Sequence, residues 1–256
     1  EIVSRDWSSD VCSSDLLGLS PLALFPGETC TEGLDGLRVR LSQALASGAR
    51  FSKWRAVFGI QPQSPTDGAV QANAHALARF AALSQEVGLT PVVEPEVLMT
   101  GGHSLERHAA VTSCVLREVF RALVAQRVHL EAMVLKTNLV LPGSACGEHV
   151  APAMIAGATL QVMRRVVPAA VPGIAFLSGG LSEEEATRHL NALNHEGGAP
   201  WQRSFSFGRA LQHSALRAWA GVPANRGAAQ AALHRRAACN SAARFGNYDE
   251  AMERAA

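Results

Sequence analysis

The stretch Met133-Val134-Leu135-Lys136-Thr137-Asn138-Leu139-Val140 decides the fold class of this chain, because it places one lysine in a short run of Val and Leu. Short apolar runs rich in branched residues are typical of buried strands. The predicted strand covers 130–140 and lies between two segments of helical period at 105–126 and 151–167. A strand between two helices is the unit from which parallel α/β sheets are built.

The same alternation continues in both directions along the chain. Further strands are predicted at 51–60, 90–98, 173–177 and 204–207, and further helices at 32–47, 66–87, 182–194, 209–220 and 226–244. Polar residues recur at regular spacing, since Lys53 to Glu94 is 41 residues, Glu94 to Lys136 is 42, and Lys136 to Ser178 is 42. This repeat indicates an α/β barrel or a doubly wound sheet. No Gly-x-Gly-x-x-Gly or Walker loop follows a strand, which disfavours a nucleotide-binding sheet.

The number of repeats predicts an incomplete (β/α)₈ TIM barrel with about five of the eight βα units. Eight units at this spacing would need more than about 300 residues, and the chain has 256. Residues 1–16 show neither helical nor strand periodicity and lack the basic start and apolar run of a signal peptide. They resemble a translated sequencing adapter, so we expect a non-native or disordered segment at 1–16 and one partial barrel domain at 17–256.

Composition disfavours several classes of protein. The formal net charge is +1, with no run of like charge, so we expect no nucleic-acid partner. No apolar stretch approaches the roughly 18 residues of a membrane span, so we expect no membrane partner either. Five scattered cysteines without a Cys-x-x-Cys pair fit a reducing cytoplasm. The nine histidines show no metal-ligand spacing; we expect no metal, with His103 and His108 exposed at a helix start.

Lysine is rare in this chain, so each of its two positions is a candidate for a chemical role. Of 23 basic residues only Lys53 and Lys136 are lysine. An amine can lose its proton and attack a carbonyl, which a guanidinium cannot do. Apolar neighbours and a second cation both favour the neutral amine, so Lys136 is a candidate Schiff-base nucleophile. The alternatives are a strand-end lysine whose ammonium reaches water, and a coding bias toward arginine.

Paired charges are predicted on the inner face of the barrel. Side chains at i and i+2 of a strand share a face, which pairs Lys53 with Arg55 and Glu94 with Glu96. Two inward carboxylates either form ion pairs with the basic residues, or one of them shuttles protons. Lys53 is either the second cation beside Lys136 or an ion-pair partner of Glu94 or Glu96, and both interpretations can hold together.

Two strand-to-helix loops have the composition of phosphate sites. The first loop is Ser178-Gly179-Gly180, which leads into the helix at Ser182. The second is Ser206-Phe207-Gly208-Arg209, which ends the last predicted strand and starts the helix that follows it. Backbone amides at a helix start bind anions, and an arginine adds a bidentate grip. Loops after the seventh and eighth barrel strands often bind phosphate. An ordinary turn and a surface arginine remain the alternatives; two true sites would suit a substrate with a phosphate at each end.

Several motifs together resemble class I fructose-bisphosphate aldolases over nearly all of residues 20–250. They are Gly27-Glu28-Thr29-Cys30-Thr31-Glu32-Gly33-Leu34-Asp35-Gly36-Leu37, Lys53-Trp54-Arg55, Val93-Glu94-Pro95-Glu96, Phe176-Leu177-Ser178-Gly179-Gly180, Ser182-Glu183-Glu184-Glu185 and Ser206-Phe207-Gly208-Arg209-Ala210-Leu211. The resemblance implies a cytoplasmic, homotetrameric lyase of glycolysis and gluconeogenesis. It implies reversible cleavage of fructose 1,6-bisphosphate to dihydroxyacetone phosphate and glyceraldehyde 3-phosphate, without metal or cofactor.

The resemblance also implies a role for each matching residue. Lys136 matches the lysine that forms the Schiff base, Glu94 the glutamate that shuttles protons, and Lys53 the second active-site lysine. Arg55 and Glu96 match polar residues that support them. The phosphate-contacting positions are matched by Ser178, Gly179, Ser206, Gly208 and Arg209.

The sequence also departs from the family pattern. Thr137 stands where the family usually has proline, and Tyr248 does not match the mobile C-terminal tyrosine of some relatives. The family's cleavage aspartate and a further phosphate-side lysine have no counterpart, so we expect an N-terminally truncated relative. The alternatives from other classes are a different Schiff-base sugar-phosphate lyase, such as a transaldolase with one phosphate site, and a non-catalytic scaffold protein.

We predict that the chain as written shows little or no cleavage of fructose 1,6-bisphosphate. The aspartate that serves C–C cleavage has no counterpart, and an unclosed barrel leaves two exposed sheet edges. A coupled assay of glyceraldehyde 3-phosphate release measures this, and a version with the preceding strands restored is the active control. Turnover by the chain at the rate of that control would contradict the prediction.

Overall fold

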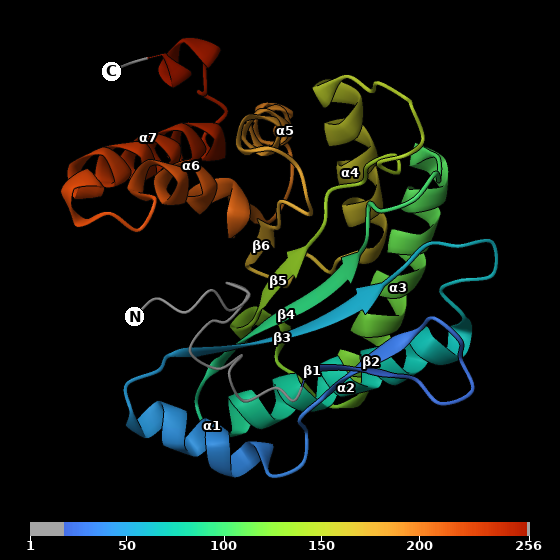
Figure 1. Ribbon diagram of the computed structural model, residues 1–256. Helices are drawn as coiled ribbons and strands as arrows, with labels where there is room; N and C mark the ends of the chain where they lie inside the picture. Colours follow the sequence, from blue (N-terminus) through green and yellow to red (C-terminus); the bar gives the residue numbers. More distant parts are fainter. Residues whose placement is uncertain (1–17, 255–256) are drawn as a thin grey trace.

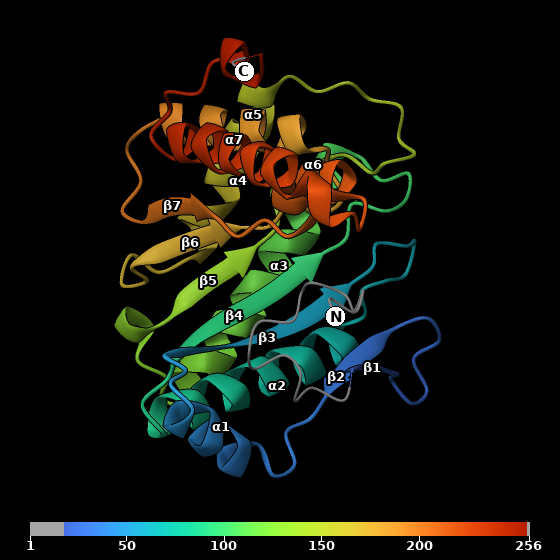
Figure 2. The same ribbon diagram turned by 60° about the vertical axis from the view of Figure 1, so that its left-hand side comes forward.

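The centre of the protein is a five-stranded parallel sheet. The computed structural model describes residues 18–254, so our expectation for residues 1–16 lies outside them. The strands β3 (Phe51–Phe58), β4 (Thr90–Val97), β5 (Val134–Thr137), β6 (Gly173–Phe176) and β7 (Gln202–Phe205) are hydrogen-bonded in chain order (Figure 2). A helix follows each strand: α2 (Asp67–Glu86), α3 (Leu105–Ala125), α4 (Pro152–Val166), α5 (Glu183–His195) and α6 (Arg209–Trp219). The five predicted βα units are confirmed, and their unbroken order excludes a doubly wound arrangement of these strands.

Strand alternation divides the sheet into an apolar face and a charged face. Helices α2, α3 and α4 lie along one face of the sheet (Figure 1). Trp54 of β3 points to that face and packs on Phe80 of α2, with 5.6 Å between ring centroids. Because neighbouring side chains on a strand point to opposite faces, Lys53 and Arg55 point away from the helices. The apolar face stabilises the sheet, and each fully buried large apolar side chain contributes about 1.5–3 kcal/mol.

An antiparallel hairpin precedes the sheet, and the sequence did not predict it. Strands β1 (Gly18–Pro21) and β2 (Thr29–Glu32) pair with each other, and α1 (Leu37–Ala46) follows. The predicted helix at 32–47 was therefore wrong over its first five residues. Gly33 and Gly36 adopt φ angles of +122° and +69°, which glycine tolerates and which interrupt a helix.

Two of the predicted strands differ in their bounds. Residues Leu130–Ala132 form a short 3₁₀ helix, η2, so β5 is only four residues long instead of spanning 130–140. Strand β7 lies two residues earlier than predicted, because it pairs with β6 from Gln202 opposite Gly173 to Phe205 opposite Phe176. Ser206 and Phe207 consequently belong to the loop between β7 and α6.

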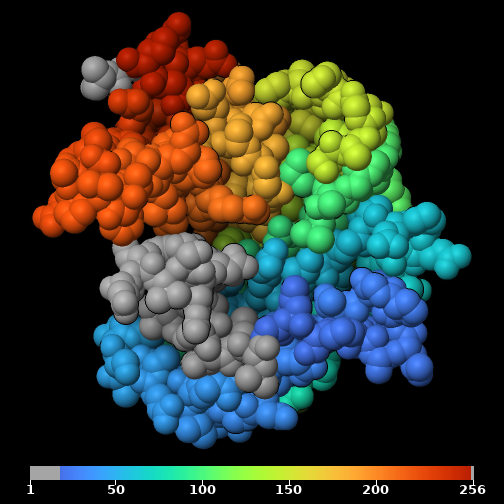
Figure 3. Space-filling view, in the orientation of Figure 1, coloured from blue at the N-terminus to red at the C-terminus, as the bar shows by residue number. Residues whose placement is uncertain are grey.

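A polar cluster fixes the C-terminal end of the described chain. Helix α7 (Arg226–Arg244) packs on α5 and α6, and the 3₁₀ helices η3 (Pro223–Asn225) and η4 (Glu250–Glu253) flank it. Buried Arg236 contacts Glu253 and donates a hydrogen bond to Thr187 at 2.6 Å. Tyr248 donates to Glu253 at 2.8 Å, and burial followed by this bond raises its pKa. In Figure 3 these orange and red segments form a lobe at one end of the molecule, away from the blue hairpin.

No helix within 18–254 combines the length and hydropathy that a bilayer crossing requires. The four cysteines in the same range are free thiols: Cys30, Cys114, Cys146 and Cys239.

We predict that Ser182→Ala lowers the free energy of unfolding by about 1 kcal/mol. Ser182 caps α5 in a capping box, where its hydroxyl accepts from the Glu185 amide at 3.2 Å and its amide donates to the Glu185 carboxylate at 3.0 Å. Urea unfolding measures the difference, and Ser182→Thr, which keeps the hydroxyl, is the matched control. Equal unfolding midpoints for Ser182→Ala and the unaltered chain would contradict this role.

Candidate active site

The C-terminal ends of the parallel strands surround a cavity of about 280 Å³. Its lining comes from β3 through β7 and the loops after them: Arg55, Glu94, Glu96, Lys136, Leu177, Ser178, Gly179, Ser206, Gly208 and Arg209. Every predicted site residue except Lys53 is in this set, and Lys53 lies behind Glu94. The structure thus brings together residues that span positions 53 to 209 of the sequence.

A carboxylate shared by two lysines forms the floor of the cavity. Lys136 Nζ lies 3.0 Å from Glu94 Oε1, and Lys53 Nζ lies 2.9 Å from Glu94 Oε2. The exposed fractions of the side chains are 11% for Lys136, 3% for Glu94 and 1% for Lys53. The Lys136 amine is therefore held against a carboxylate inside the barrel rather than extended into bulk water. Lys53 is at once an ion-pair partner of Glu94 and the second cation of the site.

A second ion pair holds the other carboxylate of the cavity, that of Glu96. Arg55 Nε donates to Glu96 Oε2 at 2.6 Å, and the Arg55 side chain is 30% exposed at the cavity. Each glutamate thus has its own basic partner. At their formal charges, the five groups together carry one net positive charge, which favours an anionic ligand.

Two strand-to-helix loops form the rim of the cavity. Gly179 and Gly180 adopt positive φ angles of +57° and +99° in the turn between β6 and α5, a conformation that glycine allows. Gly208 precedes α6 at the N-cap position without any side-chain cap. The first amide bonded within the turn is that of Leu211, which donates to the Gly208 carbonyl, so the amides of Arg209 and Ala210 have no intrahelical acceptor. Arg209, the first residue of α6, is exposed beside them. This is the geometry of an anion site at a helix N-terminus.

His108 is buried, and the prediction of an exposed residue was wrong. It is 0% exposed, stacks on His103 at 5.1 Å between ring centroids, and its Nδ1 accepts a hydrogen bond from the Leu141 amide at 3.2 Å. Burial, and then the neighbouring His103, lower its pKa to about 4. The signal was present in the sequence, since Leu105, His108 and Val115 share one helical face with spacing i, i+3 and i+10. His108 supports the segment after β5, which follows Lys136.

Metal ligands do not converge in the described part of the chain. Within residues 18–254, no three His, Cys, Asp or Glu side chains are placed to hold an ion. The donor set of the cavity is two carboxylates, each already bound by a basic side chain. The groups in the cavity that are available for chemistry are therefore the Lys136 amine, the carboxylates of Glu94 and Glu96, and the backbone amides of the rim.

Comparison with known proteins agrees with this geometry. A parallel barrel sheet with an amine, carboxylates and anion-binding loops at its C-terminal edge is the arrangement of a barrel enzyme. The family model described as glycolytic, fructose-bisphosphate aldolase class-I, matches residues 16–256. The chain is 47% identical over 232 residues to a probable fructose-bisphosphate aldolase class 1 of Xanthomonas axonopodis pv. citri. It is 50% identical over 232 residues to cytoplasmic isozyme 2 of fructose-bisphosphate aldolase from Pisum sativum.

A solved structure extends the likeness to three dimensions. The aldolase of Plasmodium falciparum, determined with TRAP and a small-molecule inhibitor, superposes with a TM-score of 0.90 at 43% identity, covering 92% of this chain and 68% of that one. The two sequence relatives are each matched by 90% of this chain, which spans 70% and 64% of their respective lengths. The chain belongs to the class I fructose-bisphosphate aldolase family, whose members are lyases of glycolysis.

We predict that His108 makes the protein less stable as the pH falls from about 6.5 to about 4. The unfolded chain binds a proton at His108 in this window, whereas the folded state does not until about pH 4. The stability from a neutral His108 is fully present above 6.5, and up to about 3 kcal/mol is lost by pH 4. His103, whose pKa is lowered by burial and then by Arg107, acts in the same direction.

Urea unfolding of the unaltered chain and of His108→Gln between pH 4 and 7 measures this effect. The glutamine oxygen still accepts from the Leu141 amide, so the variant loses the titration and keeps the hydrogen bond. We expect a flatter pH dependence in the variant. Identical slopes for the two proteins would show that His108 does not titrate differently on folding.

Proposed function

We propose that this site captures the C2 ketone of a sugar phosphate on Lys136 and serves fructose 1,6-bisphosphate chemistry. The observation that carries the proposal is the contact of 3.0 Å between the Lys136 amine and Glu94 inside a cavity with anion-binding loops at its rim. A general acid–base partner acts at about 2.6–3.2 Å from the proton it moves. Because the chain spans 70% and 64% of the two sequence relatives, the activity of this chain is a proposal.

The geometry supports a sequence of proton transfers between Glu94, Lys136 and the substrate. Glu94 takes a proton from the Lys136 ammonium, and the neutral amine attacks the C2 carbonyl to form a carbinolamine. Glu94 returns that proton to the C2 hydroxyl, which leaves as water, and a protonated imine remains. Cleavage of the C3–C4 bond then requires a base that takes the C4 hydroxyl proton while the C3–C4 electron pair enters the imine, which yields an enamine and the aldehyde. The resemblance assigns that base to an aspartate with no counterpart in this sequence, so the steps that we propose for Glu94 and Lys136 end at the protonated imine.

Lys53, Arg55 and Glu96 act in this proposal as supporting groups. Lys53 holds the far oxygen of Glu94 at 2.9 Å and so fixes the carboxylate whose other oxygen faces Lys136. Arg55 reaches the cavity from β3 while Glu96 fixes its guanidinium at 2.6 Å. A guanidinium held in this way can bind a substrate oxygen without first losing side-chain freedom.

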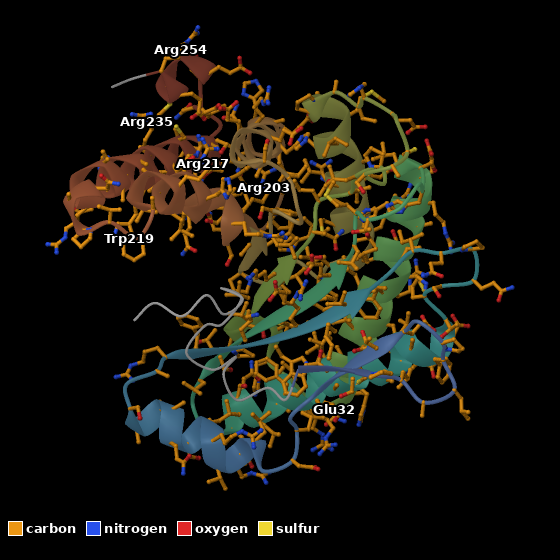
Figure 4. The ribbon with its side chains drawn as sticks, viewed as in Figure 1. Glu32, Arg203, Arg217, Trp219, Arg235 and Arg254 are labelled. Carbon is orange, nitrogen blue, oxygen red and sulfur yellow. The ribbon has the colours of Figure 1, made fainter. Side chains whose placement is uncertain are left out.

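The rim residues bind the phosphates in our proposal. Ser178 and Gly179 serve one group, and Ser206, Gly208 and Arg209 serve another. Residues 197–248 contain seven arginines and no Asp or Glu. In Figure 4, Arg217 lies on α6 and Arg235 lies on α7. This excess of positive charge in the segment raises the local concentration of a doubly charged anion, which supports a bisphosphate over a neutral sugar.

The same likeness supports our proposals for compartment and assembly. The relative in Pisum sativum is named a cytoplasmic isozyme, and we propose the cytoplasm for this chain as well. A homotetramer stays the assembly that we expect from the family.

We predict that borohydride with dihydroxyacetone phosphate adds one ketose-derived group to the chain, and adds it at Lys136. Only two lysines are present, so peptide mass mapping distinguishes Lys136 from Lys53 without ambiguity. Lys136→Met should abolish the adduct. Arg79→Ala, an exposed change on α2 outside the cavity lining, is the matched control. An adduct at Lys53, or none on a folded chain, would refute the proposed role of Lys136.

A further inference from the structure

The backbone pairing between β4 and β5 stops just before Glu94 and Lys136. These strands pair only at Val92 with Val134 and at Val93 with Leu135, whereas β3 and β4 form eight pairs. In the same register the next pair would be Glu94 opposite Lys136. Pro95 then follows on β4, and a proline offers a carbonyl but no amide to a ladder. Backbone pairing therefore does not set the separation of β4 and β5 at the site.

Two side chains join the strands where the ladder ends. The Thr137 hydroxyl donates to the Pro95 carbonyl at 3.2 Å, and the Val97 amide donates to the Asn138 side-chain oxygen at 2.9 Å. Thr137 is 0% and Asn138 4% exposed, so water does not compete for these bonds. Thr137 and Asn138 directly follow Lys136, and Pro95 lies between the two active-site glutamates. We call these two hydrogen bonds the β4–β5 seam.

Helix α3 in turn fixes the Asn138 end of the seam. The Asn138 side-chain amide donates to the Thr112 hydroxyl at 3.3 Å and to the Leu139 carbonyl at 3.1 Å. With its oxygen bound to the Val97 amide, Asn138 has little freedom to turn. The seam is thus a defined connection and not an incidental contact at a strand end.

We infer that Thr137, supported by Asn138, is a positioning residue that sets the distance between the Lys136 amine and Glu94. The inference rests on the proposed function, because it concerns the proton transfer between these two groups. Their separation of 3.0 Å lies within the 2.6–3.2 Å that such transfer requires. Without the Thr137 hydroxyl, the Pro95 carbonyl has no donor from β5, and the strands can separate. Displacements of about 1 Å can cost up to about 100-fold in rate.

The test compares Thr137→Val, which keeps the shape and loses the hydroxyl, with Thr137→Ser, which keeps the donor. Borohydride trapping with dihydroxyacetone phosphate gives the rate of imine formation on Lys136. At saturating ligand we expect Thr137→Val to be about tenfold slower, with the half-saturating concentration unchanged within about twofold. Thr137→Ser should trap within about twofold of the unaltered chain.

A second measurement needs no reaction with sugar. Acetic anhydride acetylates neutral amines, and with only two lysines mass spectrometry follows Lys136 and Lys53 separately across pH. We expect Thr137→Val to move the acetylation profile of Lys136 while that of Lys53 stays in place. Thr187→Val is the matched control, because Thr187 is also 0% exposed with a bonded hydroxyl, but lies on α5 away from the cavity.

The outcomes distinguish the positioning role of Thr137 from the proposed function of the site. Trapping and acetylation by Thr137→Val that equal those of the unaltered chain would overturn the positioning role. A Thr137→Ser variant that traps as slowly as Thr137→Val would also overturn it. So would a Thr187→Val variant with the same loss of trapping rate and the same change in acetylation, since either result would indicate a general effect of lost stability. If the unaltered chain forms no adduct, the proposed function fails, and the acetylation profiles still decide whether Thr137 positions Lys136.

Discussion

A buried carboxylate that needs two positive partners governs the architecture of this protein. Glu94 is 3% exposed, and an isolated ionised carboxylate in such a place would be very costly. Lys53 and Lys136 compensate it at 2.9 Å and 3.0 Å. Because loss of one partner of a buried pair typically costs about 3–5 kcal/mol, the three side chains depend on one another. Any packing of this chain must keep β3, β4 and β5 adjacent at this level.

A parallel sheet in chain order satisfies that requirement directly. Each βα unit returns the chain to the same edge of the sheet, so residues about forty positions apart arrive side by side. The helices cover the opposite face, where Trp54 and its neighbours form the apolar core. Packing and chemistry thus use alternate residues of the same strands. The core side chains hold the sheet, and the interleaved polar side chains meet in the cavity without disturbing it.

The parts of the fold and of the site that follow from local periodicity could be predicted from the sequence. The parts that depend on which distant strands pair with each other could not. The spacing of Lys53, Glu94 and Lys136 indicated both the barrel sheet and the meeting of the three residues, which the structure shows. The β1–β2 hairpin and the ends of β5 and β7 depend on which strand lies alongside, and no local pattern reports that. The exposed position predicted for His108 was wrong, because its place on the apolar face of α3 outweighs the polarity of its side chain.

The charge balance at Glu94 also bears on the proposed chemistry. An ammonium and a protonated imine carry the same charge, so formation of the imine on Lys136 would leave the buried carboxylate compensated. The two lysines bind different oxygens of Glu94, so a change at Lys136 does not require Lys53 to give up its contact. The ion pairs that hold the strands together can therefore persist while Lys136 reacts. A site of this kind gains its reactivity without giving up the interaction on which its fold depends.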